Sequence, residues 1–291
     1  MVQFQQLIAL LNGMNQMKEN KEYKNKMIDI VNAEKVFKEY LQNFDLKDPK
    51  ISLKVTHTYA VLSSAKYIAE NLNLSKEDYD LACLIALLHD IGRFEQLKEY
   101  DSYDDTLGMN HAEFGIKILF EENKIRDFIE ENTFDEIIYK AIANHNKIKI
   151  DDDGFTDREL MHSKIIRDAD KLDNFRVKEK ESFVALFEEG QDEKTMGALE
   201  ITDGIFNTFK EKTLIKMTDR VTFMDHWVSF IAFIFDLNYD ASLKLIKDKN
   251  YIDILVDRID YSNEDTKQKM EEIRNISKEY IESRIGIENK V

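Results

Sequence analysis

Apolar and polar positions follow a clear helical period from Ile28 onward. Between residues 55 and 72, apolar side chains recur every three or four positions, which predicts a helix with one buried face. These positions are Val55, Tyr59, Leu62, Ala65, Ala69 and Leu72. Asp48 and Pro49 stand before them, and Asp at the N-cap with Pro at the first helical position favours a helix start. We therefore predict a long helix that begins at Pro49.

Three further helix starts place Ser or Thr three positions before an acidic residue, the pattern of a capping box. They are Ser75 with Asp78, Thr133 with Glu136, and Thr156 with Glu159. We expect the helices that they open to end near Gly92, near His145 and near Leu172. The C-terminal part has the same style, with helices predicted over 230–237, 241–254 and 265–285. Nine Gly and one Pro are too few to end many hairpins, so the predicted fold class is all-α, with about a dozen helices.

Composition limits the range of partners and compartments. The chain has 57 acidic residues against 41 Lys and Arg, a net charge of −16, which argues against binding a nucleic-acid polymer. It also argues against docking on an anionic membrane, and the longest uncharged apolar run, 228–235, is far shorter than the roughly 20 residues that span a bilayer. Cys83 is the single cysteine, which excludes an internal disulfide. With no basic leader pattern at the start, we expect a cytoplasmic protein.

One pair of polar residues is placed where apolar residues are expected. The segment DLACLIALLHD, residues 80–90, is apolar almost all round and ends in His89 and Asp90. A buried carboxylate costs several kcal/mol unless it is paired or bound to a metal. The alternative is that both side chains cap the last turn of this helix and reach water.

Three more histidines and one aspartate stand near the ends of predicted helices. They are His57, His111, His145 and Asp170. Helix ends can meet at one point in a bundle, although sequence spacing alone does not establish it. His162 lies about 80° around its helix from Asp170, and His226 beside Trp227 is better explained by packing. Asp168 and Asp173, on either side of Asp170, either face elsewhere or support the ligands.

Five separated motifs share an order with a known family. They are His57, HDIGRFEQ (89–96), HAEFG (111–115), ANH (143–145) and DADKLDN (168–174). In this order the chain, over about residues 50–180, resembles the HD superfamily of metal-dependent phosphohydrolases. The family pattern H…HD…D is matched by His57, His89, Asp90 and Asp170. Members that hold two metals add two histidines, matched by His111 and His145.

The resemblance implies an HD-domain helical bundle and a role for each matched residue. His57, His89, Asp90 and Asp170 are implied as ligands of a first metal, with Asp90 bridging to a second metal held by His111 and His145. Such nitrogen-rich ligation suits one or two ions of Mn, Fe, Co, Ni or Zn. A metal-activated hydroxide then attacks a small anionic phosphate substrate, a nucleotide-like phosphomonoester or phosphodiester. The chain lacks the HDIGK and GYP motifs of one subtype, so the substrate stays open.

Arg93 and Lys171 are the next candidates for catalysis, beside Asp90. Arg93 follows Asp90 by three residues, and its guanidinium suits a phosphate; Lys171 adjoins Asp170 and offers a point charge. Arg93 has the alternative of pairing with Glu95 or Asp90, and Lys171 that of a solvated surface residue. We divide the chain into an N-terminal segment (1–26, a loosely attached helix), an HD-domain core (27–185) and a helical extension packed on the core (186–291). The oligomeric state is not predicted.

Two other functions fit the same ligands. A few members of the superfamily use this set to hold two irons and activate oxygen on a polyol or phosphonate. A non-enzymatic helical protein that binds a metal or ligand is the third possibility. The complete ligand set argues against this third possibility, because a metal site without function is expected to lose some of its ligand residues.

Overall fold

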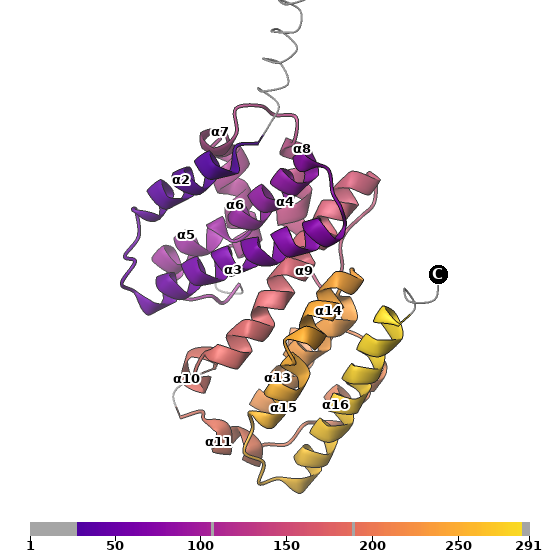
Figure 1. The fold of residues 1–291 in the computed structure, drawn as a ribbon. Helices are drawn as coiled ribbons and strands as arrows, with labels where there is room; N and C mark the ends of the chain where they lie inside the picture. Colours follow the sequence, from indigo (N-terminus) through magenta and orange to yellow (C-terminus); the bar gives the residue numbers. More distant parts are fainter. Residues whose placement is uncertain (1–27, 106–107, 188–189, 287–291) are drawn as a thin grey trace, which may run out of the picture.

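The computed structural model describes residues 28–105, 108–187 and 190–286, and within them the chain is helical throughout with no strand (Figure 1). The predicted all-α fold is confirmed. None of the helices in these three stretches combines the length and the apolar character that crossing a membrane requires. The predicted N-terminal segment, 1–26, lies outside the described residues.

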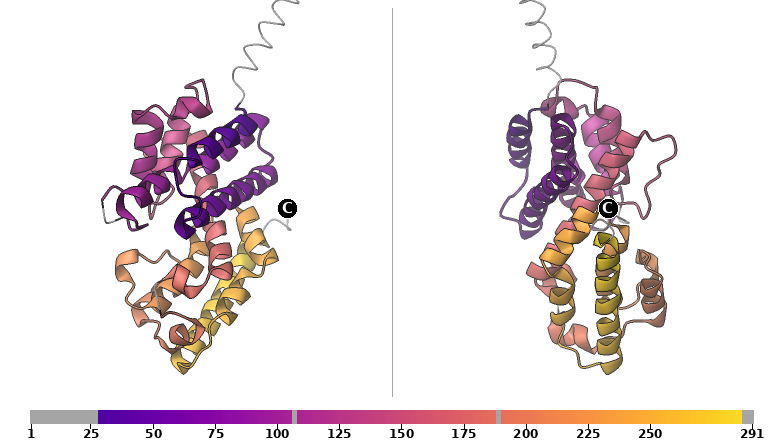
Figure 2. Two further views of the ribbon diagram at one scale, coloured as in Figure 1. Left: turned by 90° about the vertical axis from the view of Figure 1, so that its left-hand side faces the viewer. Right: turned by 45° about the vertical axis from the view of Figure 1, so that its right-hand side comes forward.

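The helices form two groups that share the long helix α9. The first group comprises α2 (Ile30–Leu41), α3 (Pro49–Asn71), α4 (Lys76–Leu88), α5 (Ile91–Tyr100), α6 (His111–Ile116) with a π-helical continuation (Lys117–Glu121), α7 (Ile125–Phe128), α8 (Asp135–Asn144) and α9 (Asp157–Lys180). The second comprises α10 (Phe183–Leu186), α11 (Glu193–Ala198), α12 (Asp203–Lys210), α13 (Phe223–Ile231), α14 (Asp240–Asp248), α15 (Tyr251–Asp257) and α16 (Glu264–Ile285), with 3₁₀ turns at Met217–Asp219 and Ala232–Asp236. Helix α9 packs against α3, α4 and α8 of the first group and against α13, α14 and α15 of the second (Figures 1 and 2).

Helix α4 is the centre of the first group. Every residue from Asp80 to Leu88 is buried, and α4 packs against α2, α3, α8 and α9. Each buried Leu or Ile contributes about 1.5–3 kcal/mol from burial alone, so this helix is the main apolar anchor of the bundle. The Ser75 hydroxyl accepts from the backbone N–H of Asp78, which confirms the predicted start.

The predicted end of this helix was wrong by four residues. Helix α4 ends at Leu88, His89 and Asp90 form the link, and Gly92 lies inside α5. A Cβ at Gly92 would overlap the carbonyl oxygen of His111. Glycine therefore allows α5 to approach α6 closely, which brings His111 beside the link.

Other predicted boundaries also need correction. Helix α9 continues to Lys180 instead of ending near Leu172, because buried residues such as Phe175 give its last two turns a packed face. Helix α8 begins at Asp135 without a side-chain cap from Thr133. The helix predicted over 241–254 is two helices, α14 and α15, because Asn250 between them is left-handed with φ of 54°. The helix predicted over 230–237 is the end of α13 followed by a 3₁₀ turn.

The structure confirms other predicted helix boundaries. Asp48 caps α3 with Pro49 in its first turn, and Thr156 and Glu159 form a complete capping box on α9. Helix α16 covers the segment predicted over 265–285. The boundary placed at residue 185 falls within α10, and the division into domains stays a prediction.

Candidate metal centre

Five elements bring the predicted ligands to one buried place. Helix α3 carries His57, and the link between α4 and α5 carries His89 and Asp90. His111 is the first residue of α6, as predicted, His145 is the C-cap of α8, and Asp170 lies on α9. Apart from Asp170, which is half-buried, all of these residues are buried.

The carboxylate of Asp90 lies between two pairs of histidine rings. Its Oδ2 is 3.6 Å from Nε2 of His57 and 3.7 Å from Nε2 of His89. Its Oδ1 is 3.5 Å from Nε2 of His111 and 3.7 Å from Nε2 of His145. Each oxygen of this one carboxylate thus faces its own pair of ring nitrogens, which is the arrangement that a bridging ligand of two cations needs.

The other nitrogen of each ring has a hydrogen-bond acceptor. Nδ1 of His57 donates to Asp173 at 2.6 Å, and Nδ1 of His111 donates to Asp105 at 2.8 Å. Nδ1 of His89 and of His145 donate to the carbonyl oxygens of residues 86 and 142, at 2.8 and 2.7 Å. These bonds orient all four rings, as in protein metal sites, and leave Nε2 of His89, His111 and His145 with its lone pair toward Asp90.

Three of the four Nε2 atoms, those of His89, His111 and His145, lack the donors that such lone pairs require. Nε2 of His89 is buried without a hydrogen-bond partner. Nε2 of His111 and Nε2 of His145 lie 3.0 Å apart, and their Nδ1 atoms carry the ring protons, so two lone pairs face each other. A cation between such atoms relieves this repulsion, so the donor set fits divalent ions. Two groups of ligand atoms, each within 4.8 Å of one another, meet this need: His57, His89 and Asp90, and Asp90, His111 and His145.

Asp170 joins the first group through His57. Its Oδ1 is 3.2 Å from Nε2 of His57. Burial alone lowers the pKa of His57, but the hydrogen bonds with Asp170 and Asp173 outweigh burial and raise it above its ordinary value. Burial raises the pKa of Asp170, yet the hydrogen bond and charge of His57 hold it well below the usual range.

Burial keeps two of the other rings neutral. It lowers the pKa of His89 to about 4 and the pKa of His111 to about 4. Burial opposes ionisation of Asp90, but Lys54 and His89 hold its pKa well below the usual range. A charged carboxylate among neutral imidazoles is the protonation state in which these residues bind a metal.

Lys54, which the sequence analysis did not select, lies against this cluster. Its Nζ donates to Oδ2 of Asp90 at 3.0 Å. Lys54 precedes His57 by three residues on α3, so helical spacing places both side chains on one face. That spacing is the signal that could have identified Lys54. Asp105, which orients His111, lies in a loop and carries no comparable signal.

Arg93 is held by neighbours beside the cluster. Its Nη1 donates to Asp105 at 2.9 Å, to Gln96 at 2.7 Å and to the carbonyl of Tyr103 at 2.8 Å, and its Nε lies 3.7 Å from Oδ1 of Asp90. Its main partner is therefore Asp105, and neither Glu95 nor Asp90 takes that place. The predicted role of Arg93 in binding phosphate stays a prediction.

Lys171 is buried, so the alternative of a solvated surface residue is wrong. Its Nζ forms an ion pair with Asp236 at 2.9 Å, and the guanidinium of Arg167 shares that carboxylate at 2.6 Å. Burial and the charge of Arg167 lower the pKa of Lys171. These contacts tie α9 to the 3₁₀ turn at Ala232–Asp236, and the predicted catalytic role stays untested.

The remaining candidates have separate surroundings. His162 pairs with Asp78 at 3.0 Å, and His226 packs against the rings of Phe187 and Phe223. Asp168 accepts from the backbone N–H groups of residues 238 and 239 at the start of α14. Of the two aspartates that flank Asp170, only Asp173 thus supports a candidate ligand.

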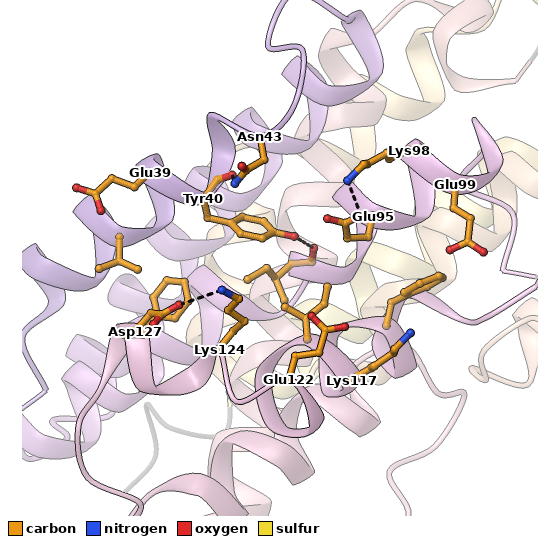
Figure 3. A pocket seen from close by; sticks show the side chains of 15 residues that line it. Glu39, Tyr40, Asn43, Glu95, Lys98, Glu99, Lys117, Glu122, Lys124 and Asp127 are labelled. Carbon is orange, nitrogen blue, oxygen red and sulfur yellow. Dashed lines mark hydrogen bonds and ion pairs between the residues drawn. The ribbon is translucent and has the colours of Figure 1, made fainter.

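A groove of about 780 Å³ lies apart from these residues (Figure 3). It runs between α2, α5 and the π-helical segment, and charged side chains of both signs rim it above an apolar floor. None of the six candidate ligands lines it. The donor chemistry therefore places the candidate site at Asp90 instead of in this groove.

Comparison with known families agrees with the geometry. Residues 55–174 match the family model described as HD domain, which confirms the predicted resemblance. All six candidate ligands fall inside this range. No curated protein and no solved structure compared with the chain matches it.

Proposed function

We propose that the chain is a metal-dependent phosphohydrolase that acts on a small phosphate ester, a nucleotide-like phosphomonoester or phosphodiester. The observation that carries this proposal is Asp90, whose two oxygens each face a pair of oriented histidine Nε2 atoms. His57, His89, Asp90 and Asp170 would hold one divalent ion, and Asp90, His111 and His145 a second.

The residues around the ions have definable tasks. Divalent ions bound here would acidify a water molecule and offset negative charge on a phosphate group. Asp173 and Asp105 orient the rings of His57 and His111, so that Nε2 of each ring faces Asp90. The ammonium of Lys54, next to Asp90, adds a positive charge where phosphate oxygens would lie.

Hydrolysis by the full chain, loaded in turn with Mn, Fe, Co and Ni, tests the proposal on a broad panel of phosphate esters. We expect metal-stimulated release of phosphate or nucleotide, which His89→Ala and Asp90→Ala abolish. His226→Ala is the control, since His226 only packs against aromatic rings. Absence of hydrolysis with every metal contradicts the proposal, and oxygen uptake by the iron-loaded chain would instead support the oxygenase alternative.

A further inference from the structure

A second lysine near the candidate site is buried without a counter-ion. Lys178 is 6% exposed, and among the residues that the structure describes no carboxylate forms an ion pair with it. Its Nζ lies 3.8 Å from the ring centroid of Phe230, the first residue of the predicted segment 230–237. The contact of a cation with an aromatic face stabilises less than burial of an unpaired charge costs.

Lys178 lies within electrostatic range of the metal-ligand region. Its ammonium is close enough to Lys54, Asp170 and Asp173 for their charges to act on its pKa, which burial and Lys54 lower to about 7. Lys178 follows Asp170 by eight residues on α9, about 12 Å along the helix axis and about 80° around it, with Asn174 between them.

The exposed side of the cluster lies at Lys54 and Asp170. The side chains of Asp170 and Lys54 are 20% and 17% exposed, whereas those of Asp90, His89, His111 and His145 are at most 4% exposed. A ligand that reaches the cluster therefore enters beside Lys54 and Asp170. Phe230 and Asn174, each partly exposed, border this side.

We propose that Lys178 binds a second anionic group of the substrate, at a distance from the phosphate that lies against Lys54 and the metal centre. The proposal rests on the proposed function and narrows the substrate class to phosphate esters with a further carboxylate or phosphate. The incoming anion supplies the counter-ion that Lys178 lacks, and the shared charge of Lys54 and Lys178 favours a dianionic ligand over a monoanionic one.

Binding of non-hydrolysable phosphonates to the Mn-loaded full chain tests this proposal by calorimetry. Methylphosphonate carries the first anionic group alone. Phosphonoacetate, 3-phosphonopropionate and 4-phosphonobutyrate add a carboxylate at increasing distance. We expect at least one of the three to bind about tenfold or more tighter than methylphosphonate, the gain typical of a charge-assisted hydrogen bond.

Variants of Lys178 show whether this side chain causes the gain in affinity from the carboxylate. Lys178→Gln and Lys178→Met should remove the gain from the carboxylate and leave the affinity for methylphosphonate within about twofold. Lys180→Gln is the control, because Lys180 is exposed on the same helix and pairs with Glu179. Lys178→Met keeps an apolar stem against Phe230, and its melting temperature should equal or exceed that of the wild type, since it removes a buried charge.

The outcomes distinguish this proposal from the proposed function. If the wild type hydrolyses phosphate esters and binds methylphosphonate, but no carboxylate improves binding, Lys178 has no such role and the proposed function stands. The same conclusion follows if both Lys178 variants keep the gain. If the wild type neither binds methylphosphonate nor hydrolyses any ester, the proposed function itself fails.

Discussion

Asp90 in the first group of helices and Asp225 in the second are both buried, but their surroundings are opposite. Asp225 accepts hydrogen bonds from the backbone N–H groups of Thr202, Val221 and Thr222, at 2.9 to 3.1 Å. Asp90 instead faces four Nε2 atoms, with Lys54 as its donor, and the rings of His89, His111 and His145 carry their protons on Nδ1, away from it. The protein satisfies Asp225 from its own backbone, which is typical of a structural residue. Around Asp90 it leaves lone pairs that a cation satisfies.

The largest effect is expected from Asp90→Asn. The change removes the charge and one of the two oxygens that face the histidine pairs. Metal affinity should fall by more than the roughly 10–100-fold that is typical of losing an outer-shell partner, and hydrolysis should fall with it. Metal content after dialysis, measured by mass spectrometry, checks this. Retention of wild-type metal content would remove Asp90 from the site.

Asp225→Asn should have the reverse effects. An amide nitrogen would meet backbone donors, so the free energy of unfolding should fall by about 1–3 kcal/mol, while metal content stays that of the wild type. Urea unfolding and metal analysis of the same sample measure both. Loss of metal without loss of stability would break the distinction between the two aspartates.

Acid should destabilise the metal-free chain through the first group of helices. His89 and His111 have folded-state pKa values of about 4, below the unfolded value of 6.5, so the folded state binds fewer protons between these limits. The contribution of these neutral rings to the free energy of unfolding is complete at pH 7 and is lost as pH falls from 6.5 toward 4. At pH 5 each ring has lost about 2 kcal/mol of this contribution. His57, whose pKa is raised, opposes part of this loss.

Urea unfolding at pH 7 and pH 5 measures the loss. His89→Asn should reduce the difference between the two values, because it removes one of the titrating rings. An unchanged difference in this variant would show that His89 is not held neutral by burial.

The smallest effect is expected from Lys171→Met. Asp236 keeps Arg167 as its partner in this variant, so kcat/KM should change by less than about fivefold, or about 1 kcal/mol in transition-state free energy. Steady-state kinetics on the best ester found measures it. A loss of 100-fold or more would restore Lys171 to catalysis, as its position beside Asp170 in the sequence predicts.

Motif order and apolar periodicity predicted the cluster and the central helix. The run 80–90 is apolar almost all round, so burial of its apolar part follows from composition, whereas burial of His89 and Asp90 was one of two possibilities and the alternative, that both reach water, is wrong. The supporting contacts lie outside these motifs: Asp105, which orients His111, carries no local signal, whereas the three-residue spacing from His57 could have identified Lys54. The length of α9 was underestimated because its last turns pack against helices far along the chain, and the burial of Lys178 has the same origin.

The most direct test of the account is the number and place of metal ions in the full chain as purified. Metal analysis together with anomalous scattering from crystals gives both. We expect two divalent ions per chain, one on each side of Asp90, with His57 and His89 at one and His111 and His145 at the other. A single ion, with the rings of His111 and His145 turned away from Asp90, would contradict it.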